Sequence, residues 1–206
     1  MLLRDDLLLA MTRLDACDDA RSWLASCPAC TFADLWDACP RGDWLLWLAG
    51  RLPGLEAQVG RATAAVARLA LTAIPDEHPG ADELREIVRV GAEVTEVGGK
   101  SGALYDRAVL LTIYNDGLDE QIGDLGVLLS EMDPTSAYAV AWNVAHVPGE
   151  VVYWRGCNAT QETLDRLDDE GLRATADAVR SVLGAEEVED ALASFLWSAP
   201  CAGVAA

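Results

Sequence analysis

The stretch LEAQVGRATAAVARLALTAI, residues 55–74, decides the fold class of this chain. Its apolar side chains recur at intervals of three and four residues, which is the spacing of one face of an α-helix. The residues on that face are Val59, Ala62, Val66, Leu69 and Ala70. Because helix-breaking residues flank the stretch, Pro53-Gly54 before it and Pro75 directly after it, the sequence predicts one long amphipathic helix buried along one side.

The same helical spacing continues on both sides of this stretch. Before it, apolar residues repeat every three or four positions from Leu3 to Leu14 and through several short segments up to residue 52. After it, helices are predicted at residues 84–98, 101–114, 118–132, 158–179 and 188–196. Almost no segment alternates between apolar and polar residues as a half-buried strand does. We therefore expect an all-α fold, a compact bundle or orthogonal array of about eight to ten helices.

Helix starts are predicted where a capping residue precedes a helical pattern. The predicted starts are Asp18, Thr31 (with Asp34 three residues on), Asp43, Ser101, Asp133 (with Pro134) and Asn158 (with Gln161).

The segment from Ala137 to Tyr153 allows two interpretations. Residues 137–147 are mostly apolar, and Pro148-Gly149 then interrupts the run before a second short apolar segment. A buried helix that ends near Pro148 fits this pattern, and so does a hairpin that turns there. We favour the helix.

Residues 17–52, CDDARSWLASCPACTFADLWDACPRGDWLLWLAGRL, hold four of the seven tryptophans and four of the six cysteines. Trp44 and Trp47 are three residues apart and therefore lie on one helix face, together with Leu48. Tryptophan is highly buried on average, although an exposed one makes a good anchor for a protein partner. We expect these tryptophans to pack in the core.

The pair Cys27-x-x-Cys30, with Cys39 nearby, has the spacing of a metal half-site. Structural zinc needs four ligands, usually in two clustered pairs. The candidates for a second pair, Cys157, Cys201, His78 and His146, are isolated in the sequence. We therefore expect no metal and no other cofactor, with reduced thiols, and with Cys17, Cys30 and Cys39 packed as small core residues.

No catalytic or nucleotide-binding pattern is complete. Residues 98–102, GGKSG, are similar to the end of a phosphate-binding loop, but Val94 stands where that loop requires a glycine, and the preceding residues predict a helix rather than a strand. Residues 115–117 and the acids after them have a calcium-like composition without the ligand spacing. His78 and His146 have no nucleophile or acid at a recognisable spacing. We expect a protein that is not an enzyme.

The length of 206 residues suits one domain, because a chain of this size buries roughly 70% of its unfolded surface. We expect a single helical domain over residues 1–206, with residues 75–80 as the point where a Trp-rich scaffold (1–75) would divide from an acidic helical part (81–206). Arg4 and the two aspartates after it interrupt what would be the apolar core of a signal peptide, and no apolar run approaches the ~20 residues of a membrane span. We expect a cytoplasmic protein without a membrane partner.

The net charge of −19 is unevenly distributed along the chain. Up to Pro75 there are nine acidic and seven basic residues, a net charge of −2, whereas the remaining 25 acidic and 8 basic residues give −17. A potential this negative repels nucleic acid and anionic membranes and favours a basic protein partner. The alternative explanation of the negative charge is solubility, although keeping a domain in solution requires only a modest net charge.

Two acidic segments near the C-terminus are the predicted partner-binding surface. An acidic segment is ordinarily the solvated side of a helix, but it can also mimic phosphate and enter a basic groove on another protein. The residues are Asp165, Asp168, Asp169, Glu170, Glu186 and Glu187.

One part of the chain resembles a known family. The pattern Cys17-x-x-Ala-Arg-x-Trp-Leu, then Trp36-x-x-Cys, then Arg41-Gly-Asp-Trp-Leu-Leu-Trp-Leu, resembles a helical family assigned to the immunity proteins of bacterial polymorphic toxin systems. Similar segments occur in phage and actinobacterial proteins. The resemblance covers the first third of the chain, to Pro75, and carries over no catalytic residues. It implies a helical, non-enzymatic, cytoplasmic protein that neutralises another protein.

These observations predict an acidic inhibitor that occludes a basic surface, such as the nucleic-acid channel of a nuclease toxin. Two other functions fit the same sequence. One is a phage-encoded anti-defence protein that binds a host immune effector, and the other is a helical module that binds a small molecule.

Overall fold

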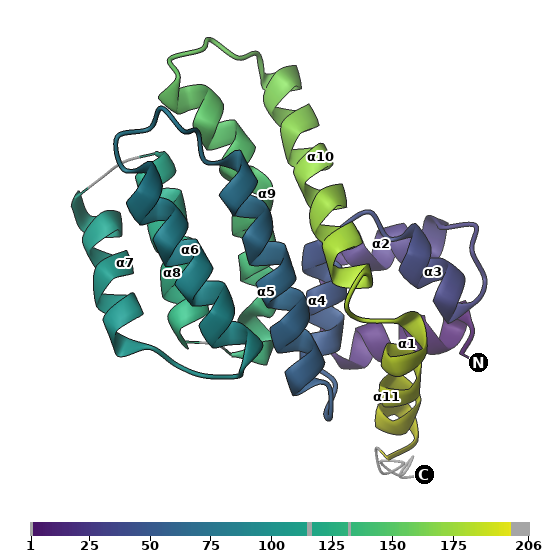
Figure 1. The fold of residues 1–206 in the computed structure, drawn as a ribbon. Coiled ribbons are helices and arrows are strands. Elements are labelled where there is room, and N and C mark those ends of the chain that lie inside the picture. The colour runs from purple at the N-terminus through teal and green to yellow at the C-terminus, as the bar shows by residue number, and fades with distance from the viewer. Residues whose placement is uncertain (1, 115–116, 132, 199–206) are drawn as a thin grey trace.

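The computed structural model describes residues 2–114, 117–131 and 133–198 (Figure 1). Over these residues the chain is all-α, as predicted, with eleven α-helices, one 3-10 turn and no strand. The helices are α1 (Arg4–Arg13), α2 (Asp18–Ser26), α3 (Phe32–Ala38), α4 (Gly42–Gly50), α5 (Glu56–Ala73), α6 (Ala81–Glu96), α7 (Gly102–Tyr114), α8 (Leu118–Glu131), α9 (Ala137–Trp154), α10 (Gln161–Arg180) and α11 (Ala185–Ser198), and the 3-10 turn is η1 (Pro134–Ser136).

The longer helices α5 to α10 run side by side, and the short helices α1 to α4 with α11 form a second group beside them (Figure 1). Helix α9 lies at the centre, because it packs against α4, α5, α8 and α10. One continuous cluster of buried apolar side chains extends from Leu2 through α5 and α9 to Leu196. The two groups therefore share a core.

Helix α5 confirms the amphipathic prediction. Val59, Ala62, Val66 and Ala70 are buried, and Leu69 is half-buried.

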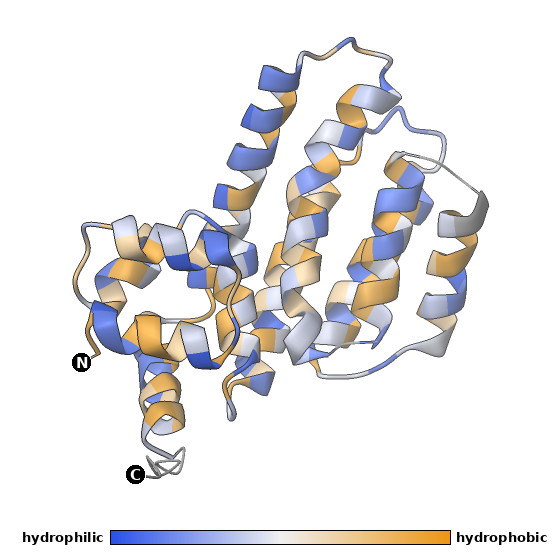
Figure 2. Cartoon of the chain, turned by 180° about the vertical axis from the view of Figure 1, so that it is seen from behind, coloured by the Kyte–Doolittle hydropathy of each residue, from blue (hydrophilic) through white to orange (hydrophobic). Residues whose placement is uncertain are grey.

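A small residue allows helix α10 to pack closely on α9. A Cβ atom added at Gly171 of α10 would lie 2.2 Å from the carbonyl oxygen of Ala145 in α9. The hydrophilic residues of α10 give that helix an outward-facing polar side (Figure 2).

Several predicted helix starts are confirmed at the capping atom itself. The Thr31 hydroxyl accepts a hydrogen bond from the Asp34 amide, the Asp133 carboxylate accepts one from Thr135, and the Ser101 hydroxyl accepts one from Leu104. Each contact joins residues at most three positions apart, which is why the sequence reveals it.

Three predicted starts are wrong by one or two residues. Thr160, not Asn158, caps α10, since its hydroxyl accepts a hydrogen bond from the Thr163 amide. Asp18 and Asp43 lie inside the first turns of α2 and α4 rather than before them. There an acidic side chain interacts favourably with the helix dipole instead of capping the helix.

Helix α9 is longer than predicted, and the hairpin interpretation is wrong. The helix continues through Pro148 to Trp154. A proline inside a helix removes one backbone hydrogen bond. Packing of α9 against four neighbouring helices outweighs that loss, because tertiary contacts supply most of the stability of a helix in a protein.

The predicted core packing of the tryptophans and cysteines is only partly right. Trp36 and Cys39 are buried, but Trp44 and Trp47 are half-buried. Cys17 and Cys30 are exposed, because they lie in the connections before α2 and α3 rather than on the inner face of a helix. The predictions for residues 115–116 and for Cys201 lie outside the described residues.

Candidate functional site

A groove of about 490 Å³ opens where the turn between α1 and α2 meets α4 and the start of α9. Aromatic rings form one part of its lining and charged side chains form the other. The rings are those of Trp44, Trp47, Tyr138 and Trp142, and the charged side chains are those of Asp15, Asp19, Arg41 and Asp43.

The helical repeat explains why the rings converge. Trp44 and Trp47 are three residues apart on α4, and Tyr138 and Trp142 are four residues apart on α9, so each pair projects from one side of its helix. Because α4 packs against α9, the two pairs line the same groove. Asp15 adopts a positive φ of 60°, a conformation that aspartate tolerates better than most residues, and this turn brings the start of α2 to the groove.

Arg41 already places a cation against two of these rings. Its guanidinium carbon lies 4.6 Å from the ring centre of Trp44 and 5.6 Å from that of Trp142, within the range of cation–π attraction. The same guanidinium donates to both carboxylate oxygens of Asp43, at 3.1 and 2.8 Å. Burial opposes the charge on Arg41, but the hydrogen bonds to Asp43 and the charges of Asp43 and Asp19 outweigh it and raise the pKa of Arg41.

The lining has an excess of negative charge, three carboxylates against one guanidinium. Asp43 forms an ion pair with Arg41, whereas Asp15 and Asp19 are exposed and form no ion pair with any described residue. Carboxylates beside open aromatic faces attract cations and repel anions. The groove is therefore suited to a positively charged group.

One predicted acidic residue lies next to this groove. The imidazole of His146 lies 4.2 Å from the ring of Trp142, centre to centre, and its Nε2 lies 3.6 Å from the Asp168 carboxylate. His146 Nδ1 donates to the carbonyl oxygen of Trp142, which orients the imidazole. Asp168 thus belongs to the surroundings of the groove.

The other predicted acidic residues do not form one surface with it. Asp165, Asp169 and Glu170 are exposed on the first half of α10, and Glu186 and Glu187 lie in the first turn of α11. At 1.5 Å per residue, Asp165 is about 20 Å from the end of α10, so the two predicted segments are well separated.

The neighbourhoods of these carboxylates also differ. On α10, Glu170 pairs with Arg166 and Asp169 lies 4.0 Å from Arg173 on the same helix. On α11, Glu187 accepts a hydrogen bond from the Gly184 amide, and the helix contains no basic residue.

Neither the cysteine pair Cys27-x-x-Cys30 nor His78 forms a binding site among the described residues. Among residues 2–114, 117–131 and 133–198, no group of three histidine, cysteine or acidic side chains is placed to hold a metal ion. Cys27 is buried while Cys30 is exposed. His78 is buried against the ring of Trp154, and its Nδ1 accepts a hydrogen bond from the Gly80 amide. This histidine closes the turn before α6.

Sequence reasoning missed Tyr138 and Trp142 because they lie in a run of mostly small apolar residues. Their four-residue spacing was the available signal, but it does not distinguish a buried face from an exposed one. In the structure Tyr138 is 41% exposed and Trp142 is 47% exposed.

Comparison with protein-family models, with curated proteins and with solved structures gave no match for this chain. Among the described helices, none combines the length and the apolar character that crossing a bilayer requires.

Proposed function

We propose that this chain is a non-enzymatic binding protein that recognises and inhibits a basic protein, as an immunity protein neutralises a toxin such as a nuclease. The observation that carries the proposal is the aromatic groove with its excess of carboxylates, on a chain with a net charge of −19. A cytoplasmic location goes with this proposal.

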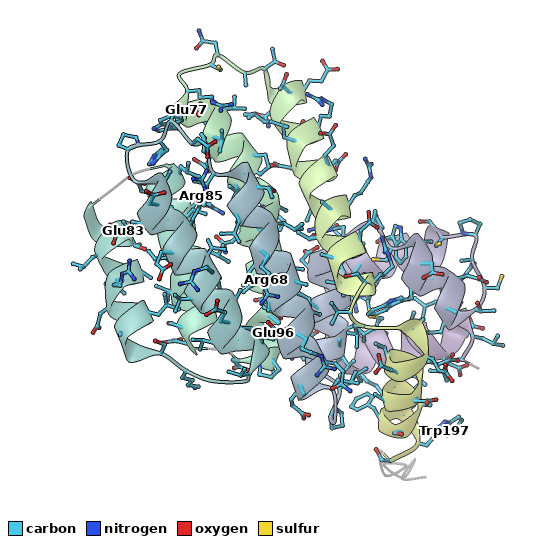
Figure 3. All side chains as sticks on the ribbon, viewed as in Figure 1. Arg68, Glu77, Glu83, Arg85, Glu96 and Trp197 are labelled. Atoms are coloured by element: carbon cyan, nitrogen blue, oxygen red, sulfur yellow. The ribbon has the colours of Figure 1, made fainter. Side chains whose placement is uncertain are left out.

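The surface charge supports a basic partner. On the face formed by α5, α6 and α7, two acidic side chains of α6 form ion pairs with neighbouring helices, Glu96 with Arg68 of α5 and Glu83 with Arg107 of α7 (Figure 3). Glu186, Glu187 and Asp190 of α11 form no ion pair with a base of the described chain. Negative charge that the fold leaves unpaired is available to a partner.

The proposed mechanism is steric and electrostatic. Carboxylates on α10 and α11 would occupy positions that phosphate groups take on a basic surface, and the bound protein would block access to that surface. Long-range attraction would speed the encounter, and this steering weakens as salt screens the charges.

The family resemblance supports the same proposal. Cys17, Arg41, Asp43, Trp44 and Trp47 belong to the pattern that carries the resemblance, and all five line the groove. Part of the resembling segment is thus gathered at one surface feature, whereas Trp36, Cys39 and Leu46 of the same pattern are buried in the core.

A second candidate function is the binding of a small organic cation. The groove volume of about 490 Å³ lies within the range of small-molecule sites, and its lining combines rings with a few charged groups. The negative charge outside the groove has no role in the binding of a small cation. For that reason we rank this second function below the first.

The test begins with the tagged protein as bait in a lysate of its natural host, followed by purification of the captured protein. Association rates are then measured from low to high salt. Three triple variants remove equal charge from different helices: Asp165→Asn, Asp169→Asn and Glu170→Gln on α10; Glu186→Gln, Glu187→Gln and Asp190→Asn on α11; and Glu120→Gln, Asp124→Asn and Glu131→Gln on α8.

We expect the partner to be basic, its activity to be lost at equimolar complex, and its association rate to fall steeply with salt. Neutralising α10 or α11 should slow association more than the matched change on α8. An association rate that does not depend on ionic strength would show that charge does not drive recognition, and the proposal would be wrong.

A further inference from the structure

We infer that the groove receives an arginine side chain of the basic partner, which would make it the anchoring contact of the complex. This inference rests on the proposed function and specifies the chemical group that the partner presents.

The first argument is that the groove already holds one guanidinium. The guanidinium carbon of Arg41 lies 4.6 Å from the ring centre of Trp44 and 5.6 Å from that of Trp142, and Asp43 binds the guanidinium at two points. Planar stacking together with two-point carboxylate binding is the geometry that distinguishes arginine from lysine. The walls of the groove are therefore built from groups that suit a guanidinium.

The second argument is that the groove has further groups that can bind a second cation besides Arg41. Asp15 and Asp19 also line the groove, are exposed and form no ion pair within the described chain. Tyr138 and Trp142 are each more than two-fifths exposed. An incoming cation thus meets two exposed carboxylates and two partly exposed aromatic side chains, of which Trp142 also contacts Arg41 and His146.

The third argument concerns which occupant fits. An anionic occupant, such as a nucleic acid or an acidic peptide, would be repelled by the three carboxylates of the lining. An apolar peptide would leave Asp15 and Asp19 beside it without water or a partner, which is costly for a charged group. A protein loop that carries an arginine satisfies both the rings and the carboxylates.

The experiment uses a capped peptide, acetyl-Gly-Arg-Gly-amide, and its neutral counterpart in which citrulline replaces arginine. Citrulline has nearly the same shape but lacks the positive charge. Binding to the full chain is followed by the indole N–H resonances of the tryptophans, assigned with single Trp→Phe variants.

We expect the arginine peptide, and not the citrulline peptide, to shift the resonances of Trp44, Trp47 and Trp142 in a saturable manner. Trp142→Leu should weaken binding by about fivefold, as expected for the loss of one exposed cation–π contact. The Asp15→Asn/Asp19→Asn variant should also weaken binding, whereas Glu120→Gln/Asp124→Asn, with the same change in charge on α8, should leave it unchanged. Circular dichroism confirms that each variant is folded.

Equal shifts from both peptides, or shifts confined to tryptophans outside the groove, would overturn the inference. So would equal weakening by the two double variants, because that would show a general charge effect. The proposed function fails separately, through the salt dependence measured with the captured partner. A basic partner that binds unchanged to Trp142→Leu would leave the proposed function standing and refute the anchor.

Discussion

Arg41 and Asp43 form a two-point ion pair at the floor of the aromatic groove, with Nε 3.1 Å from Oδ1 and Nη2 2.8 Å from Oδ2. The Asp43 side chain is only 9% exposed and that of Arg41 is 25% exposed. The pair therefore fixes the position of the guanidinium between Trp44 and Trp142.

Asp43→Asn should destabilise the fold, because it leaves the partly buried Arg41 guanidinium without its charged partner. We expect the free energy of unfolding to fall by about 2 kcal/mol, less than for a fully buried pair because water still reaches Arg41. Urea denaturation followed by circular dichroism measures this. The control is Glu170→Gln, which breaks an exposed pair with Arg166 and should cost less than about 1 kcal/mol. Equal costs for the two variants would show that the Arg41–Asp43 pair is not structural.

Gly42→Ala should loosen the contact between α4 and α10. A Cβ atom at Gly42 would lie 2.5 Å from the backbone carbon of Thr175, and backbone on both sides cannot move aside cheaply. We expect a loss of about 1–3 kcal/mol in unfolding free energy. Gly102→Ala is the matched control, because no atom lies within 4 Å of its added methyl group and α7 begins there. That variant should be neutral or slightly stabilising, and a similar loss in both would contradict the packing argument.

Arg180→Met should lower the free energy of unfolding, because it removes the hydrogen bonds that Arg180 makes at the end of α3. Arg180 donates to the carbonyl oxygens of Trp36 and Cys39, at 3.3 and 2.7 Å, and these carbonyls belong to the helix end that lacks partners within the helix. Leaving them unsatisfied should cost about 1–3 kcal/mol in thermal or urea unfolding. Arg173→Met, on the same helix but exposed and 4.0 Å from Asp169, should change stability by less than about 1 kcal/mol.

Stability should decline at alkaline pH through Cys39. Burial raises the pKa of the Cys39 thiol from 9.0 to about 11, so the folded state holds the thiol proton more tightly than the unfolded chain does. The stability that this difference provides is fully present below pH 9 and is lost as the pH rises through 11. Relative to Cys39→Ala, the protein should therefore lose up to about 2–3 kcal/mol across that range.

Unfolding curves at intervals between pH 8 and pH 11.5 measure this difference. Cys30→Ala serves as the control, since it removes an exposed thiol instead of the buried one. A constant difference between the protein and Cys39→Ala across this range would show that the thiol does not titrate with the fold.

The sequence alone was enough for features that depend on near neighbours in the chain. The apolar face of α5, the Thr31 cap and the Asp133 cap each arise from residues within one or two helical turns. The sequence reveals these features because residues that share a helix face or form a helix cap lie within three or four positions of one another. Where a local signal opposed the tertiary contacts, as at Pro148, the sequence alone gave a helix that was too short.

What the sequence determined is therefore the fold class, most helix boundaries and the sign of the charge. The tertiary structure decided where these features meet. Trp44 and Trp142 are 98 positions apart in the chain, and only the packing of α4 on α9 brings them to one groove. Helical periodicity shows which residues share a face of their own helix, but not which distant helix covers that face, because this is settled by the shape and volume of all the side chains packed together.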